Sequence, residues 1–291
     1  NDKGFIMKNI HRTVILSALL MGMLLPGLLG AQDNEPELSG FSRSRMAFQY
    51  DDGNLFLNEQ MLSLKLDWQA DTLDVHADVA LTSQDVNSLR TDVNELYINW
   101  FGDSFDLRIG LQKILWGKAD GVFISDQVSP VDMSAFLTKD IEELRLAVSG
   151  ISWNYYLGAH QLEAVWLPVF TPSILPDADS IWAVAAPFPI QPEFKEAELP
   201  QASLWNAEYF LQYSWLGSLA DFQLSGGWFW NDAPIATVVD KTFTPGVGIT
   251  GITVQPEYYQ VGLVAAASSF SLGPFILKGE ASYTMNQRYQ A

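Results

Sequence analysis

Apolar and polar side chains alternate along residues 105–112, FDLRIGLQ. The apolar residues occupy the odd positions, and aspartate, arginine, glycine and glutamine occupy the even ones. A period of two is that of a β-strand with one apolar face and one polar face. The same alternation recurs over residues 62–68, 73–82 and 95–101. The pattern therefore predicts an all-β protein.

We expect about eleven strands in the chain. Their predicted ranges are 38–50, 55–69, 73–82, 95–101, 105–112, 143–156, 161–170, 203–215, 221–230, 257–270 and 275–289. Many of them carry charge on the polar face, at Lys65, Asp67, Asp74, Asp78, Arg108, Glu143, Arg145, Glu163, Lys278 and Glu280.

The lengths of the connections distinguish a barrel from a sandwich. After the second strand, tight turns alternate with long loops, and the short turn at residues 51–54 is the one exception on the long-loop side. Outer-membrane barrels have short periplasmic turns and long extracellular loops, whereas a sandwich has no reason to separate them. The sequence therefore predicts a transmembrane antiparallel β-barrel of the outer-membrane type.

An odd number of strands does not close a bacterial barrel, because these barrels have even strand numbers and an open edge is costly in lipid. We expect the barrel to be truncated at the C-terminus, and the sheet of this chain to be open and curled. A smaller closed barrel with one miscounted strand is the alternative.

The N-terminus has the pattern of a secretory signal peptide. Six residues precede Met7, a basic stretch holds Lys8 and Arg12, and an apolar core follows over residues 13–25. Small residues offer a cleavage site near Ala31. We therefore expect upstream residues and a signal peptide over 1–31, an incomplete barrel over 32–291, and export to the bacterial outer membrane.

Composition agrees with a barrel and limits its partners. The 10 Trp, 10 Tyr and 17 Phe are many for a soluble domain, and barrels carry such residues in girdles at the membrane interfaces. A sandwich with an aromatic core is the alternative. The chain has no cysteine, which removes disulfides and thiolate chemistry. The net charge of −18 argues against nucleic-acid binding and favours cations or neutral polar solutes.

Short motifs resemble those of a known family. The main ones are RIGLQ at 108–112, LWG at 115–117 and SPVD at 129–132, and further ones are LP at 199–200, NAEY at 206–209 and GPFILKGEA at 273–281. Together they resemble a porin-like family of large Gram-negative outer-membrane β-barrels, described only as a domain of unknown function and related to alginate-export-type barrels. The resemblance covers about 105–285. It implies a transport role without a defined substrate.

The long loop after residue 112 holds the candidate pore residues. Porins set their selectivity with charged constrictions and folded-in loops. Our candidates are Arg108, Lys118, Asp120, Asp126, Asp132, Glu143 and Arg145. Alternation places Arg108 and Arg145 on inward faces, where they either shape the pore or only neutralise carboxylates. The apolar residues 122–124 would be unfavourable in water, so we expect the loop 118–136 to enter the mouth as a constriction or plug.

Catalytic and metal chemistry are not expected. A barrel lipase needs a serine with a nearby histidine, but His11 leaves with the signal peptide, His76 points to the lumen and His160 lies in a turn. No Gly-x-Ser-x-Gly elbow is present. Residues 51–54 and 177–179 offer oxygen ligands for Ca²⁺, but acidic pairs of this kind are usually turn formers. We predict no enzyme, no cofactor and no metal site.

The sequence thus predicts a porin-like channel for passive diffusion of small polar or cationic solutes, gated by long extracellular loops. The alternative is an adhesin or assembly platform with a plugged barrel. The expected partners are outer-membrane lipid, small polar solutes and the barrel-assembly machinery.

Overall fold

The computed structural model describes residues 35–50, 53, 55–83, 89–119, 123–134, 138–176, 180, 182 and 192–289. The predicted signal peptide lies outside these ranges, as do Asp120 and most of both candidate calcium motifs. Within the described ranges, no helix has the length and apolar character needed to cross a membrane. The chain divides after Gln112 into two compact units.

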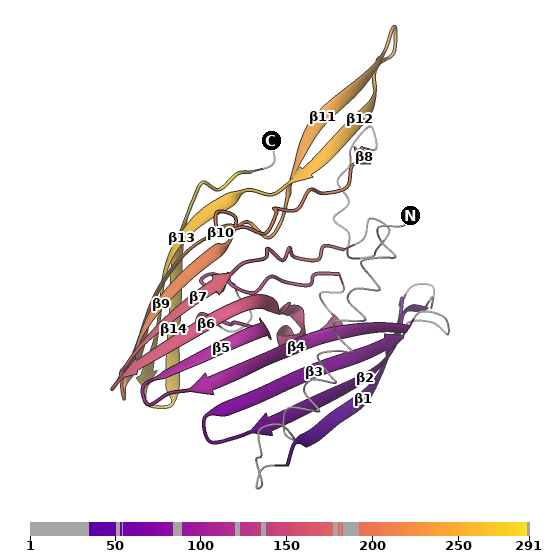
Figure 1. Ribbon diagram of the computed structural model, residues 1–291. Helices are drawn as coiled ribbons and strands as arrows, with labels where there is room; N and C mark the ends of the chain where they lie inside the picture. The colour runs from indigo at the N-terminus through magenta and orange to yellow at the C-terminus, as the bar shows by residue number, and fades with distance from the viewer. Residues whose placement is uncertain are drawn as a thin grey trace. The chain divides into compact units, whose positions relative to one another are not determined.

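The first unit is an antiparallel meander in which each strand pairs with the next (Figure 1). Its strands are β1 (Glu37–Phe48), β2 (Leu55–Gln69), β3 (Leu73–Ser83), β4 (Leu89–Phe101) and β5 (Phe105–Gln112). Strand β5 has the predicted bounds. Strand β4 begins before the predicted residue 95, because the polar stretch from Leu89 continues the ladder to β3.

The second unit contains six strands of the large sheet and a small separate sheet. The six are β6 (Val148–Leu157), β7 (His160–Leu167), β9 (Glu208–Leu216), β10 (Ala220–Trp230), β13 (Gln260–Leu272) and β14 (Phe275–Met285), in this spatial order. The small sheet joins the hairpin of β11 (Ile235–Thr244) and β12 (Gly248–Glu257) to the two-residue strand β8 (Glu193–Phe194).

The large sheet has eleven strands, which confirms the predicted number and the all-β class. In the described residues β1 pairs only with β2 and β14 only with β13, so the sheet is open, as expected.

Two further predicted strands begin later than expected, and one predicted loop contains strands. The predicted strand at 143 begins only at Val148, because a 3₁₀ helix, η2 (Ile141–Leu144), precedes it. Strand β9 begins at Glu208 rather than 203. The predicted loop 231–255 contains the hairpin β11–β12, whose strands are rich in β-branched residues that favour extended structure.

Apolar side chains are exposed on one face of the sheet, and polar ones are buried on the other. In β9, Leu211 is 52% exposed, whereas its neighbour Gln212 is 6% exposed. In β2, Leu64 is 41% exposed and Ser63 only 2%. A sheet in water buries its apolar face instead. The hydrophobic effect in water therefore does not explain this arrangement, which suits a sheet whose apolar face meets lipid.

Candidate functional site

A segment of the loop after β5 crosses the polar face of the second unit. We call this segment, residues 113–119 and 123–134, the strap. Its apolar residues Ile114, Trp116 and Val128 belong to one buried cluster with side chains of β7, β9, β10 and β13. The Trp116 ring meets Phe210 edge-on at 5.9 Å between centroids, and Phe210 stacks on Phe229 at 5.0 Å. Burial of these rings seats the strap against the sheet.

Polar contacts join Trp116 to the sheet and to the strap itself. Its indole Nε1 donates a hydrogen bond of 3.0 Å to Glu163 of β7. The other carboxylate oxygen of Glu163 accepts a bond of 3.1 Å from Ser152 of β6. The backbone N–H of Trp116 donates to the Asp126 carboxylate at 3.0 Å. The backbone N–H and the indole N–H of Trp116 are thus both hydrogen-bonded, which fixes the position of this residue.

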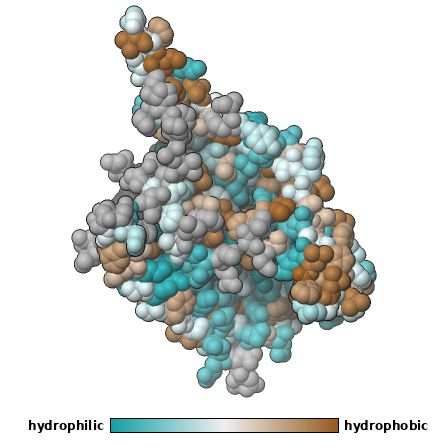
Figure 2. All heavy atoms as spheres, turned by 180° about the vertical axis from the view of Figure 1, so that it is seen from behind, coloured by the Kyte–Doolittle hydropathy of each residue, from teal (hydrophilic) through white to brown (hydrophobic). Residues whose placement is uncertain are grey.

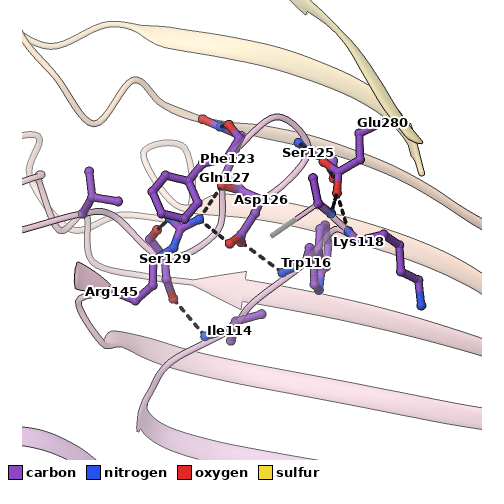
Figure 3. A network of polar contacts seen from close by, with 12 residues as sticks. Ile114, Trp116, Lys118, Phe123, Ser125, Asp126, Gln127, Ser129, Arg145 and Glu280 are labelled. Carbon is purple, nitrogen blue, oxygen red and sulfur yellow. Dashed lines mark hydrogen bonds and ion pairs between the residues drawn. The ribbon is translucent and has the colours of Figure 1, made fainter. Parts of the chain in front are cut away.

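Arg145 binds three parts of the strap (Figure 3). Its guanidinium forms an ion pair with Asp126 and donates to the carbonyl oxygens of Asp126 and Ser129. It also lies over the Phe123 ring, with 4.0 Å between the guanidinium carbon and the ring centroid. Only 4% of Arg145 is exposed. A buried arginine with these partners acts as a structural anchor, because removing either charge leaves the other without compensation.

Burial disfavours both charges of this pair. It lowers the pKa of the Arg145 guanidinium, although the carboxylates of Asp126 and Asp232 oppose this. It raises the pKa of the Asp126 carboxyl, against the opposing effect of Arg145 and of the Trp116 N–H. Burial and Glu208 also raise the pKa of Asp232 well above its usual range. The strap therefore lies in a poorly solvated site that contains several carboxyl groups.

At its other end the strap binds Glu280 of β14 (Figure 3). One carboxylate oxygen accepts the N–H groups of Lys118 and Ala119. The second oxygen accepts the N–H and the hydroxyl of Ser125, at 3.1 and 2.8 Å. The Lys118 ammonium lies 3.8 Å from the Asp221 carboxylate of β10. The strap thus connects the start of β6 with β14.

A turn at the C-terminal end of the strap is held by Asp132. Its carboxylate pairs with Lys139 and accepts the N–H of Ser134 at 3.0 Å. Burial alone would raise the pKa of Asp132, but the hydrogen bonds from Lys139 and Ser134 outweigh it and hold the pKa below its usual value.

We predict that this turn weakens in acid. Because the pKa of Asp132 is lowered by folding, its stabilising contribution is present above the unfolded value of about 3.9 and is lost as the pH falls through the folded value. Asp132→Asn should therefore speed hydrogen exchange of the Ser134 amide at neutral pH. At a pH low enough to protonate Asp132 in the folded wild-type protein, the two proteins should exchange alike. A difference that persists there would contradict the assignment.

The structure brings four of the predicted pore residues into these contacts: Lys118, Asp126, Asp132 and Arg145. Arg108 belongs to the first unit, where its guanidinium lies 4.4 Å from the Tyr97 ring centroid. Glu143 is half-buried in η2, and Asp120 lies outside the described residues.

Sequence reasoning did not select Glu163, Ser129 or Glu280 for the site. Alternation places Glu163 and Glu280 on the polar face, but Glu280 meets Lys118 across 162 residues of sequence. No local spacing shows such a contact.

Two histidines lie in the described residues, and the side chain that each of them contacts is not a serine. The imidazole of His76 lies 2.6 Å from the Asp67 carboxylate and stacks on Tyr97. That of His160 lies 2.7 Å from the Tyr213 hydroxyl.

Comparison with solved structures finds sheets of related form at low sequence identity. A loop L8 deletion mutant of OmpT, an outer membrane protein of Vibrio cholerae, is 10% identical, with a TM-score of 0.45, and the match covers 86% of this chain and 69% of that one. In-vitro folded OmpT in its trimer form is 10% identical, with a TM-score of 0.46, and the match covers 86% of this chain and 65% of that one. A mutant of the Rh. blastica porin is 12% identical, with a TM-score of 0.34, and the match covers 86% of this chain and 84% of that one.

Comparison of the sequence with known families gives a match over most of the chain. No curated protein sequence matches this chain. The profile of the family described as "Protein of unknown function (DUF1302)" matches residues 48–291, which confirms the resemblance that the short motifs indicated. The chain therefore belongs to the DUF1302 family.

Proposed function

We propose that this protein is a porin-like channel of the bacterial outer membrane through which small polar or cationic solutes diffuse passively. The observation that carries the proposal is the reversed burial of the sheet, with apolar side chains exposed on one face and polar ones buried on the other. A bilayer requires an apolar outer surface on a barrel, and an aqueous lumen requires a polar inner one. Residues 7–31 would direct its export.

The strap would form the constriction of this channel. It crosses the polar face and is held there by Arg145 and Glu280, on opposite sides of the strands between them. Hydrogen bonds that are buried at Arg145 and partly buried at Glu280 make it a fixed narrowing rather than a freely moving gate. The other long loops would limit access from outside.

The charges along the polar face favour cations. In the second unit Glu163, Asp221 and Glu280 lie on this face, and the strap adds Asp126. Arg145 compensates Asp126, the Lys118 ammonium lies near Asp221, and alternation in β14 places Lys278 on the same face as Glu280. A surplus of carboxylates lowers the potential in a narrow aqueous path and raises the local concentration of cations.

We expect the refolded full-length gene product, in which the barrel is closed, to conduct ions in planar bilayers. Under a KCl gradient the reversal potential should take the sign that a cation-preferring pore gives. A variant in which residues 118–136 are replaced by a short Gly-Ser linker should show a larger conductance. Circular dichroism before insertion checks that both forms contain β-sheet. Folded protein that conducts in neither form would exclude the channel.

The hairpin β11–β12 favours one second candidate, a surface platform with a plugged lumen. The hairpin projects from the rest of the second unit (Figure 1). Its far end exposes Phe243, Val247 and Ile249, and Figure 2 shows hydrophobic side chains gathered there. Exposed apolar patches mark contact surfaces. Conductance that appears only in the linker variant would favour this second candidate.

A further inference from the structure

The backbone of the strap forms a concave set of donors around the Glu280 carboxylate. Three N–H groups, from Lys118, Ala119 and Ser125, and the Ser125 hydroxyl converge on its two oxygens. Each oxygen receives two donors, and Figure 3 shows the Glu280 carboxylate beside Ser125 and Lys118. Successive backbone N–H groups arranged in this way bind anions without any positively charged side chain.

The shape of this site depends on Gly117. Its φ of +100° is one that side chains rarely allow. A Cβ at this position would lie 2.8 Å from both the Glu280 oxygen and the Ser125 hydroxyl. The Lys118 side chain turns to Asp221 instead of entering the site. The chain is therefore bent so that backbone donors, rather than an ammonium group, meet the anion.

We propose that residues 117–119 and 125 form a binding site for a small carboxylate, that Glu280 is the tethered ligand of this site, and that occupancy of the site fixes the strap. A carboxylate suits the donors because it is planar and has two acceptor oxygens. An amide does not suit them, because its NH₂ group would face the N–H and hydroxyl of Ser125. The effect of strap release on conductance rests on the proposed function, but the binding itself does not.

The test uses a reporter on the strap. The chain has no cysteine, so Val128→Cys introduces a single thiol at a position of the strap that is buried against the sheet. Its reaction rate with a water-soluble maleimide reports how often the strap leaves the sheet. In the full chain refolded in detergent, Glu280→Ala should raise this rate about tenfold, the factor that about 1.4 kcal/mol of lost binding gives.

Formate should then reverse the effect. At a few hundred millimolar, and at constant ionic strength with chloride, formate fills the vacated site and the rate of the Glu280→Ala protein should fall back towards that of the parent. Neutral formamide and chloride should leave it fast. The parent should not respond to formate, because its site is already filled. Glu193→Ala, which removes an exposed carboxylate on β8, is the matched control and should leave the rate unchanged throughout.

Two further variants keep the test decisive. Glu280→Gln should raise the rate by less than Glu280→Ala, because its amide oxygen still accepts two of the four donors. If Glu280→Ala fails to fold, Ser125→Ala keeps the carboxylate and removes one donor, and should raise the rate by a smaller factor. Rates unaffected by both Glu280→Ala and Ser125→Ala, or slowed equally by formate and formamide, would overturn the proposal. Rescue by formate in a protein that does not conduct would overturn the channel and leave the binding site intact.

Discussion

Replacing Leu211 by arginine is expected to lower the free energy of unfolding by about 2–4 kcal/mol, the cost of a cationic side chain at the lipid-facing midplane of a barrel. Leu211 lies in the middle of β9 and is 52% exposed. In a water-soluble protein a leucine this exposed accepts arginine with little change. The size of the effect therefore tells directly whether lipid covers this face. Urea unfolding of the refolded protein in phospholipid vesicles gives the measurement.

Leu204→Arg is the matched control for this experiment. Leu204 is 69% exposed but lies before β9, outside the strands of the sheet. We expect it to change the free energy of unfolding by no more than about 0.5 kcal/mol. Equal and small effects of Leu211→Arg and Leu204→Arg would contradict a membrane-facing surface.

Replacing Arg145 by methionine is expected to cost about 3–5 kcal/mol, as the loss of one partner of a buried ion pair typically does. Methionine fills part of the space but leaves the Asp126 carboxylate without its cation and the Ser129 carbonyl without its guanidinium donor. Burial raises the pKa of Asp126 and Arg145 opposes this, so loss of the guanidinium should raise this pKa further. Release of this end of the strap should also increase the conductance.

A double variant separates the charge effect from the loss of packing. Asp126→Asn in the Arg145→Met protein removes the uncompensated charge and keeps an oxygen that accepts the Trp116 N–H. It should therefore recover part of the lost stability, as measured by the same unfolding experiment. If the double variant is less stable than Arg145→Met alone, the ion pair is not what holds this end of the strap.

The strands of the sheet were largely predictable because each is defined by its own alternation. The bounds of β5 follow directly from FDLRIGLQ, and the turn between β13 and β14 from Gly273-Pro274. Alternation misled at 143–148, where η2 and the contacts of Arg145 to the strap replace the first part of the predicted strand. A pattern of six residues does not distinguish these two structures.

The sequence of β11–β12 contains a pattern that predicts a hairpin, although the alternation of short and long connections favours a long loop there. Pro245-Gly246 lies between two runs rich in valine, isoleucine and threonine, which is a hairpin pattern. The strap contacts had no such signal. Arg145 and Glu280 meet the strap only because the sheet brings distant strands together, and the direction of the loop over the sheet is set by the burial of Trp116. Tertiary packing of this kind is not encoded in local spacing.

The contact between Glu280 and the strap also bears on the order in which the molecule is built. Its two sides are separated by 162 residues, so the hydrogen bonds of the strap become complete only after β14 has joined β13. Until then this end of the strap is free and the polar face remains open to water, which must leave when the carboxylate is captured. Contacts between such distant residues form slowly, because a long stretch of chain has to be ordered first. The strap would therefore be fixed only after the strands from β6 to β14 have paired.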